Sequence, residues 1–348
     1  MSDRILDRLL GHHDLTGAQV RTLVARLVDP ATDDLERAAL LVALRSKGET
    51  ALEVEAFARE LRRRSVPFRG PRADGAVDLC GSGGARTPSF NVGTVSAFVV
   101  RSAGVPVAKH GNRSARGSLR GYAGSSDLLE ALGLPVTTSA EFARESYRRF
   151  GIVFLHAPLY HTATSAVLAV RRGLGIPTIF NQLGPLTNPA AVPFQVVGCP
   201  SPGVADRVAR VLPALGVRGG IAVAGDDGTD EFSPRGTSTC ILWTRGRRTR
   251  RTVAAADLLD ADDRRGPWGP LPADAAATEA RRLLAGGGGA RRGSILLTSG
   301  AALWIAGRAP NMRTGIQQAQ VALDSGRAEA LLGALQGLAG ERPWNGGA

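Results

Sequence analysis

The chain has 348 residues, 43% of them apolar, and a formal net charge of +12. This length and apolar content suffice for one large or two modest domains, each with a core of its own. No apolar run reaches the length that crosses a bilayer, and the opening residues lack a signal-peptide pattern, so we expect a soluble, cytoplasmic protein without membrane contact. The widely spaced Cys80, Cys199 and Cys240 favour buried thiols over disulfides or a metal site.

The positive charge comes almost entirely from arginine, because Lys47 and Lys109 are the only lysines. Such a charge is compatible with a nucleic-acid partner, an anionic substrate or an arginine-rich surface. The densest basic runs, residues 245–251 and 62–64, carry no interleaved aromatic side chains. We therefore interpret them as solvated surface, and a nucleic-acid site is the less favoured reading.

Residues 1 to about 68 are predicted to form a small bundle of three or four helices. Thr16 with Gln19, and Thr50 with Glu53, have the spacing of capping boxes, in which each residue of the pair bonds the backbone of the other. Apolar residues between them recur with a helical period.

After about residue 75, strand-like apolar runs alternate with amphipathic segments, which predicts a largely parallel sheet with helices between its strands. The predicted strands span residues 76–80, 105–108, 152–155, 178–181, 195–199 and 219–224. The predicted helices span residues 91–104, 125–133, 139–150, 162–174 and 203–216. The chain is expected to be helical again from residue 273 through 338.

Polar clusters follow the first two predicted strands. The glycine-rich run from Gly81 to Gly84 precedes a predicted helix, an order that suits phosphate binding because glycines and a helix start both expose backbone N–H groups. Lys109, His110, Asn112 and Arg113 follow the second strand. Neither common nucleotide-binding signature occurs, so the glycine run alone is a weak signal. Ligands of open α/β sheets nevertheless bind at such strand ends.

Four carboxylates, Asp226, Asp227, Asp230 and Glu231, follow the last predicted strand. Oxygen-rich clusters of this kind suit Mg²⁺, and an acidic turn is the alternative. His156 and His161 are five residues apart and lack the i, i+4 spacing of helical zinc ligands, which favours a structural or pocket-lining role.

Arg171, beside Arg172, is either a surface arginine or a group that holds a carboxylate through two parallel hydrogen bonds. No G-x-S-x-G motif occurs, which argues against a nucleophilic serine.

Several motifs together resemble the anthranilate phosphoribosyltransferases, enzymes of tryptophan biosynthesis, over nearly the whole chain. They are GSGGxxxxSFNVGT, VAKHGNR, SSDLLEALG, HAPLYHTA, VRRGLGIPTIFNQLGPLTNPA and GDDGTDEFS. The resemblance implies an α/β fold: a small helical-bundle domain plus a larger α/β domain with a mostly parallel central sheet and a helical C-terminal part. The implied domains are residues 1–70, joined by the helical segment 162–190, and residues 75–345. It also implies an active site in the hinge cleft between them, and a homodimer.

The resemblance further implies transfer of the phosphoribosyl group from phosphoribosyl pyrophosphate (PRPP) to the amine of anthranilate, with Mg²⁺ as cofactor. The implied catalytic residues are Lys109, Asn112 and Arg171. The implied donor-binding residues are Gly81, Ser82, Gly83, Gly84, Ser89, Asn91, Val92, Gly93, Thr94, Lys109, Arg113, Arg116, Gly117 and Ser118. The implied acceptor-binding residues are Gly81, His110, Asn112, Ala157, Pro158 and Arg171, and the implied metal ligands are Asp230 and Glu231.

The chain departs from the family pattern near the donor site. Ala85 and Gly93 replace a typical aspartate and serine, and about four extra residues lengthen the loop 115–124, in which Arg116 and Arg120 are expected to replace metal-borne charge. Two alternatives therefore stay open. One is a different acceptor in specialised metabolism, or nucleoside phosphorolysis; the other is a non-catalytic basic relative that binds nucleic acid. The retained motif residues favour phosphoribosyl transfer to anthranilate.

Overall fold

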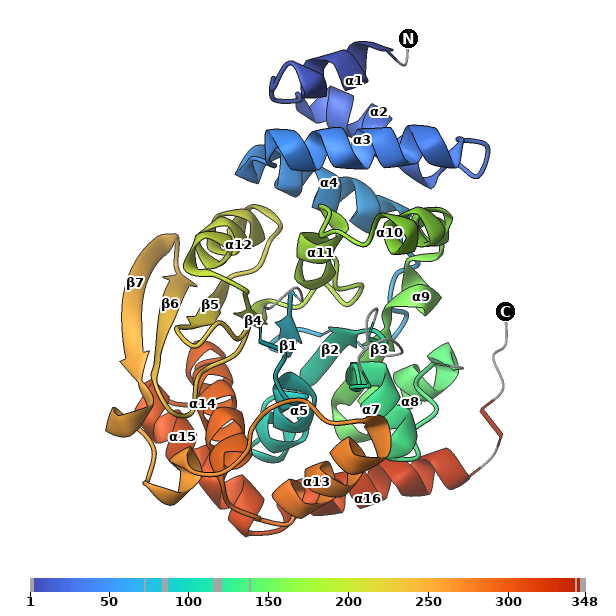
Figure 1. The fold of residues 1–348 in the computed structure, drawn as a ribbon. Helices are drawn as coiled ribbons and strands as arrows, with labels where there is room; N and C mark the ends of the chain where they lie inside the picture. Colours follow the sequence, from blue (N-terminus) through green and yellow to red (C-terminus); the bar gives the residue numbers. More distant parts are fainter. Residues whose placement is uncertain are drawn as a thin grey trace.

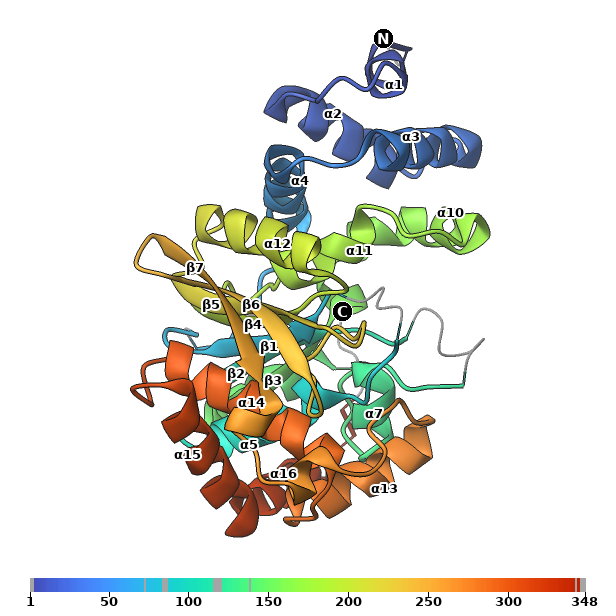
Figure 2. The same cartoon turned by 60° about the vertical axis from the view of Figure 1, so that its left-hand side comes forward.

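The computed structural model describes residues 3–71, 73–82, 87–114, 121–137, 139–341 and 343–344. A group of N-terminal helices lies on one side of a central sheet, and the C-terminal helices lie on the other side (Figures 1 and 2). In the described part of the chain, no helix is both long enough and apolar enough to cross a membrane. Cys80, Cys199 and Cys240 are buried free thiols, as predicted.

Four helices form the N-terminal part. They are α1 (Asp3–Leu10), α2 (Gly17–Val28), α3 (Asp34–Lys47) and α4 (Ala51–Arg64). Two of them, α2 and α4, begin where the capping residues predict. Both capping boxes are present: the Thr16 side chain accepts a hydrogen bond from the backbone N–H of Gln19, and Thr50 does the same for Glu53. These caps satisfy N–H groups that a helix start leaves without partners.

The sheet has seven strands in the order β3-β2-β1-β4-β5-β6-β7. The strands are β1 (Val77–Gly81), β2 (Val107–Gly111), β3 (Ile152–His156), β4 (Phe194–Gly198), β5 (Gly219–Gly225), β6 (Thr237–Thr244) and β7 (Arg247–Ala254). The first five are parallel, and β6 and β7 add an antiparallel hairpin at one edge. The predicted mostly parallel sheet is confirmed.

Helices and short 3-10 turns connect the strands and complete the C-terminal part. In chain order they are α5 (Val92–Ser102), α7 (Ser125–Ala131), α8 (Ala140–Phe150), α9 (Ala157–Tyr160), η1 (Thr162–Val167), α10 (Leu168–Leu174), α11 (Phe180–Leu183), η2 (Gly184–Leu186), α12 (Pro202–Ala214), η3 (Ala255–Asp257), η4 (Asp262–Arg264), α13 (Ala273–Leu284), α14 (Ala290–Ile305), α15 (Met312–Asp324) and α16 (Arg327–Gly340).

One strand prediction was wrong, and two strands were not predicted. Residues 178–181, expected as a strand, lead into α11, where the Asn181 side chain accepts a hydrogen bond from the backbone N–H of Thr178 and so favours a helical start. The strand β7 coincides with the arginine run that we interpreted as solvated surface, and its arginines are exposed.

The two faces of the sheet are buried against different helices. Val196 of β4 lies in a core cluster with side chains of α5, α14 and α15, whereas the next residue, Val197, lies in a cluster with α2, α4 and α12. This alternation is the period-2 geometry of a strand. The second cluster also contains Val170 of α10 and Leu183 of α11, so the segment between β3 and β4 packs with the N-terminal helices.

Candidate active site

The carboxyl ends of β1 and β4 meet where the order of the strands reverses. The chain adds β2 and β3 on one side of β1, and β4 and β5 on the other. Gly81 pairs in register with Gly198, and the backbone N–H of Ser82 donates to the Gly198 carbonyl at 2.7 Å. A Cβ atom on Gly198 would lie 1.8 Å from the carbonyl oxygen of Asp230, so only glycine lets the acidic loop approach. Such reversal points are where open α/β sheets bind ligands.

Asp78 is a buried carboxylate in the middle of β1. It accepts hydrogen bonds from the backbone N–H of His110 at 3.1 Å and from the side-chain amides of Asn188 at 2.8 Å and Gln195 at 3.3 Å. Burial raises its pKa, and the positive charge of Lys109 opposes that rise. Asp78 therefore ties the segment before β4 to the strands that carry the site. Sequence reasoning missed it, although a carboxylate inside an apolar strand was a usable signal.

His110 lies at the end of β2 and is buried. Its Nδ1 donates to the carbonyl of Gly184 at 3.0 Å, and its ring centroid lies 5.1 Å from that of His161. Burial, together with His161, lowers the pKa of His110 to about 3. The ring is therefore neutral at neutral pH, and its Nε2 has no hydrogen-bond partner among the residues that the structure describes.

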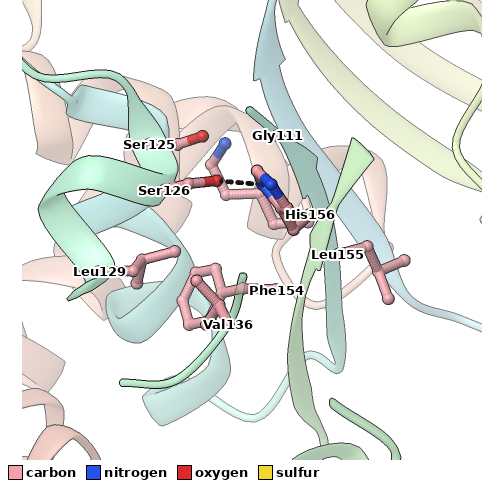
Figure 3. A pocket seen from close by; sticks show the side chains of 9 residues that line it. Gly111, Ser125, Ser126, Leu129, Val136, Phe154, Leu155 and His156 are labelled. Carbon is pink, nitrogen blue, oxygen red and sulfur yellow. Dashed lines mark hydrogen bonds between the residues drawn. The ribbon is translucent and has the colours of Figure 1, made fainter. Parts of the chain in front are cut away.

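Lys109 is the buried neighbour of His110, with 5% of its surface exposed. Within the described ranges no hydrogen bond or ion pair to its ammonium group is found, although its charge acts on both Asp78 and Glu231. Its side chain lines a cavity of about 10 Å³ together with Ser125, Ser126 and His156 (Figure 3). A buried ammonium of this kind stabilises an anion that comes within reach.

His156, at the end of β3, lines the same cavity, which agrees with its predicted pocket-lining role. Its Nδ1 lies 2.8 Å from the hydroxyl oxygen of Ser126, and Figure 3 shows the two side chains facing each other. Burial and the nearby Arg113 lower the pKa of His156 to about 4. The neutral ring therefore accepts the Ser126 proton or donates its own, according to its tautomer.

The structure divides the four acidic residues of the 226–231 loop into two pairs. Asp226 accepts a hydrogen bond from the hydroxyl of Thr237, and Asp227 accepts one from the hydroxyl of Thr229 at 2.7 Å, so both maintain the turn. Asp230 and Glu231 instead lie close enough for their charges to interact. The choice of the second pair as the candidate metal ligands stays a prediction.

Glu231 belongs to the loop after β5, and its carboxylate lies near the start of α5, where the backbone N–H of Gly93 favours its ionised form. Burial and the charge of Asp230 raise its pKa well above the usual value, while Lys109 and the Gly93 N–H act in the opposite direction. A Cβ atom on Gly93 would lie 2.6 Å from the carbonyl oxygen of Leu79, so glycine permits the close approach of α5 to β1.

The other sequence-predicted donor residues are distributed around the start of α5. Asn91 precedes the helix, and its side-chain amide donates to the Ala123 carbonyl at 3.0 Å. Ser89 is half-buried and Thr94 is buried, while Val92 belongs to the hydrophobic core, so Val92 has only its backbone to offer a ligand. The predicted residues Gly83, Gly84, Arg116, Gly117 and Ser118 lie outside the described residues.

Arg113 and Asn112 lie at the exposed end of this region. The guanidinium of Arg113 pairs with Asp127 at 3.0 Å and with Glu130 at 2.6 Å, so in this structure it is directed to α7. The side-chain oxygen of Asn112 accepts a hydrogen bond from the backbone N–H of Arg113 at 2.7 Å. The side-chain amide nitrogen of Asn112 remains a potential donor to a ligand.

Arg171 of α10 lies with its guanidinium carbon 5.3 Å from the centroid of the Phe180 ring. Burial lowers its pKa, and in the described part of the chain no carboxylate pairs with it. Phe180 begins α11, and Gly184, which binds His110, follows directly after that helix. The short helix α11 therefore connects Phe180, which contacts Arg171, with Gly184, which binds His110.

The two remaining predicted acceptor residues begin α9. Ala157 is half-buried and Pro158 is exposed, and both follow His156 directly at the end of β3. His161, just after α9, packs against the His110 ring. The structure thus joins these residues to the His110 side of the site.

Family models match both parts of the chain. The glycosyl transferase family helical bundle domain matches residues 3–65, and the glycosyl transferase family a/b domain matches residues 73–329. Anthranilate phosphoribosyltransferase of Solibacter usitatus is 39% identical over 343 residues, which cover 97% of this chain and 98% of the relative. That of Sorangium cellulosum is 41% identical over 335 residues, which cover 94% and 93% of the two chains.

Solved structures have the same fold. Anthranilate phosphoribosyltransferase from Thermus thermophilus aligns with a TM-score of 0.83 and 32% identity, covering 96% of this chain and 99% of that one. The Saccharomyces cerevisiae enzyme in complex with PRPP and Mg aligns with a TM-score of 0.85 at 22% identity, over 98% of each chain. The fold and the two matched domains define a glycosyltransferase built from a helical bundle and an α/β domain. Within that class, the chain belongs to the anthranilate phosphoribosyltransferase family.

Proposed function

We propose that the chain transfers the phosphoribosyl group of PRPP to the amine of anthranilate, giving N-(5-phosphoribosyl)anthranilate and pyrophosphate. The observation that carries this proposal is the gathering of Lys109, Asp230 and Glu231 at the reversal point of the sheet, beside the start of α5. A cation, an acidic pair and exposed backbone at one strand end suit a phosphorylated, magnesium-bound donor. The names of the relatives supply the acceptor.

The residues present fit Mg²⁺. In the described ranges no group of three or more His, Cys, Asp or Glu side chains could enclose a metal by itself. Mg²⁺ bound to a phosphorylated substrate needs only one or two protein carboxylates, with phosphate oxygens and waters completing its shell. Asp230 and Glu231 supply that number. Burial and then the charge of Asp230 raise the pKa of Glu231, and a bound cation would favour its ionised form. When bound, Mg²⁺ neutralises charge on the pyrophosphate.

The proposed donor site extends from Gly81 and Ser82, past Ser89, Asn91 and Thr94, to Lys109. Glycine and the start of α5 offer backbone N–H groups to phosphate oxygens. Lys109 provides a positive charge from a buried position, where its attraction to phosphate is weakly screened. Gly83, Gly84, Arg116, Gly117 and Ser118, which belong to this site by resemblance, remain part of the proposal.

The reaction needs positioning and charge stabilisation more than proton transfer. The amine nitrogen forms a bond to the anomeric carbon, the bond from that carbon to the pyrophosphate oxygen breaks, and the amine loses one proton. Pyrophosphate is already a good leaving group once its charge is balanced, so Lys109 lowers the barrier by stabilising the negative charge that develops on it.

The proposed acceptor site joins Arg171, His110 and Asn112, with Ala157 and Pro158 along its path. The Arg171 guanidinium has no carboxylate partner among the described residues, so it can receive the acceptor's carboxylate through two parallel hydrogen bonds. The Nε2 atom of the neutral His110 ring is buried and has no partner among the described residues, so its lone pair can accept from an amine N–H that comes within reach. The two groups would thus hold opposite functions of one aromatic amine acid.

The proposed site lies in the hinge cleft between two domains: the helical domain, which is residues 1–70 joined by 162–190, and the α/β domain formed by the rest of residues 75–345.

We also propose a homodimer that forms through α3 and α10. Leu35 is 81% exposed and Val42 is 41% exposed on α3, and Leu168 of α10 is 38% exposed. Leu35 and Val42 are seven residues apart and so share one face of α3, and α3 contacts α10. Exposed apolar patches mark association surfaces. Sedimentation should give a dimer for the natural chain and a monomer for Leu35→Asp/Val42→Asp, and a monomeric natural chain would refute the assignment.

The test of the proposed reaction is the loss of anthranilate fluorescence in the presence of enzyme, PRPP and Mg²⁺. We expect turnover by the natural chain and its near-complete loss in Asp230→Asn/Glu231→Gln, which keeps the side-chain shapes. Asp226→Asn is the matched control, because Asp226 bonds Thr237 within the turn. PRPP binding by calorimetry without turnover would indicate a different acceptor, and the absence of both would refute the proposal.

A further inference from the structure

Residues 266–272, which we call the strap, lead from η4 to α13. They contact two segments beside the candidate donor site, one at Phe90 and one at Ala123. The Trp268 carbonyl accepts a hydrogen bond from the backbone N–H of Phe90 at 3.4 Å. The Leu271 carbonyl accepts one from the N–H of Ala123 at 2.9 Å. In Figure 1 the orange segment before α13 passes in front of α5, in agreement with these contacts. The strap therefore joins two segments that lie far apart in the sequence.

Arg291, near the start of α14, binds the strap through its side chain. Its side chain is buried, and one terminal nitrogen donates to the Gly269 carbonyl of the strap at 3.2 Å. The other terminal nitrogen donates to the Glu279 carboxylate at 3.3 Å. The guanidinium carbon also lies 5.5 Å from the centroid of the Phe90 ring. One planar group thus contacts the strap, α13 and the segment that leads into α5.

These contacts lead directly to the candidate donor site. Phe90 precedes Asn91, whose side chain donates to the Ala123 carbonyl, so both segments that the strap fastens are also fastened to each other. The next residues begin α5, where the Gly93 N–H lies near the Glu231 carboxylate. A displacement of Phe90 would therefore move the backbone that faces the donor.

We propose that Arg291 is a positioning residue for PRPP binding, acting through Phe90 and the strap; the inference rests on the function proposed above. The contacts of Arg291 are with Glu279, Gly269 and Phe90, none of which is among the residues proposed to bind a substrate. Its planar fork makes the two hydrogen bonds while its face covers the Phe90 ring, a combination that a lysine ammonium cannot reproduce. Small displacements of groups that orient a substrate cost large factors in rate and affinity.

The test compares Arg291→Met, Arg291→Lys and the control Arg282→Met. Arg282 bonds the same carboxylate of Glu279, at 2.7 Å and 2.8 Å, but among the described residues it makes no hydrogen bond to the strap. For Arg291→Met we expect the KM for PRPP to rise about tenfold, with the KM for anthranilate within about twofold of the natural value. The KM for PRPP of Arg291→Lys should lie between those of the natural enzyme and Arg291→Met. Arg282→Met should match the natural enzyme in the KM for both substrates.

Direct calorimetric binding of PRPP with Mg²⁺ separates this inference from the proposed reaction. If the natural chain binds PRPP but does not convert anthranilate, the reaction proposal fails, while weaker PRPP binding by Arg291→Met still supports the positioning role. An unchanged PRPP affinity in a folded Arg291→Met would overturn the inference, as would equal losses for both substrates. If Arg291→Met does not fold, the same comparison is made with Arg291→Lys. A PRPP affinity of Arg291→Lys equal to that of the natural chain would then overturn the inference. A natural chain that binds no PRPP would overturn both proposals.

Discussion

The carboxylate of Glu231 lies near the backbone N–H of Gly93, so an acidic side chain lies at the start of the helix that faces the candidate donor site. Helix starts attract negative charge through their free N–H groups and dipole. Glu231 therefore occupies a position that suits an anion, while its neighbour Asp230 adds negative charge. This arrangement links the acidic loop after β5 with the helix after β1.

Replacing Gly93 by alanine should impair the donor site and the fold together. The new Cβ atom would lie 2.6 Å from the Leu79 carbonyl oxygen, so α5 would have to move away from β1. Forced insertions of this kind cost about 1–3 kcal/mol of unfolding free energy. Urea unfolding and PRPP titration should show both losses. Gly333→Ala in α16, where nothing lies within 4 Å, is the control and should gain about 0.5–1 kcal/mol.

Replacing Glu231 by glutamine should stabilise the protein at neutral pH in the absence of Mg²⁺. The pKa of Glu231 is raised in the folded state, chiefly by burial and then by Asp230, so folding favours the protonated form. Stability that the natural chain has at low pH is therefore lost as the pH rises through the range above the usual value of 4.5. The glutamine variant cannot ionise at this position. Its melting temperature should therefore exceed that of the natural chain at neutral pH, and the difference should shrink as the pH falls toward 4.5. An advantage independent of pH would contradict this explanation.

Replacing Arg171 by methionine should raise the KM for anthranilate by about 100-fold, because two charge-assisted hydrogen bonds to its carboxylate are lost. Arg172→Met, on the exposed neighbouring residue, is the matched control and should change that constant little. Aniline, which lacks the carboxylate, provides a second check. The natural chain and Arg171→Met should use aniline equally poorly, and a persistent difference with aniline would assign Arg171 another role.

His156 should make the folded protein sensitive to acid. Its pKa is lowered from 6.5 to about 4, mainly by burial, so it contributes stability above pH 6.5 that is lost as the pH falls toward its folded pKa. His156→Gln keeps an acceptor for Ser126 and does not titrate. As the pH falls, the unfolding free energy of the variant should therefore decrease less steeply than that of the natural chain. The two slopes should differ by at most about 1 kcal/mol per pH unit. Identical slopes for the natural chain and His156→Gln would count against the prediction.

Local patterns in the sequence were sufficient to predict most of the sheet. The strands predicted at 76–80, 152–155, 195–199 and 219–224 agree with β1, β3, β4 and β5 to within two residues. Buried parallel strands are continuous apolar runs, which is the signal that these segments carry. β7 gave no such signal, because an edge strand needs only the backbone of one neighbour and tolerates exposed arginines.

The candidate site was less accessible to sequence reasoning. Motif resemblance selected Lys109, Asp230 and Glu231, and the structure places their charges within reach of one another. Motif resemblance did not select Asp78 or Arg291, because the roles of these residues depend on partners that are distant in sequence. The amide of Asn188 reaches Asp78 across 110 residues, and such pairings follow from the assembled sheet rather than from any local pattern.

The exposed edge strand β7 has a consequence for how copies of the molecule meet at high concentration. Four of its eight residues are arginines, namely Arg247, Arg248, Arg250 and Arg251, and all four are exposed. A second copy that added its own β7 alongside would bring two rows of like charge within a few ångströms, at a cost that grows as ionic strength falls. The hairpin thus ends the sheet chemically as well as topologically, and fibril growth from this edge is disfavoured in dilute salt.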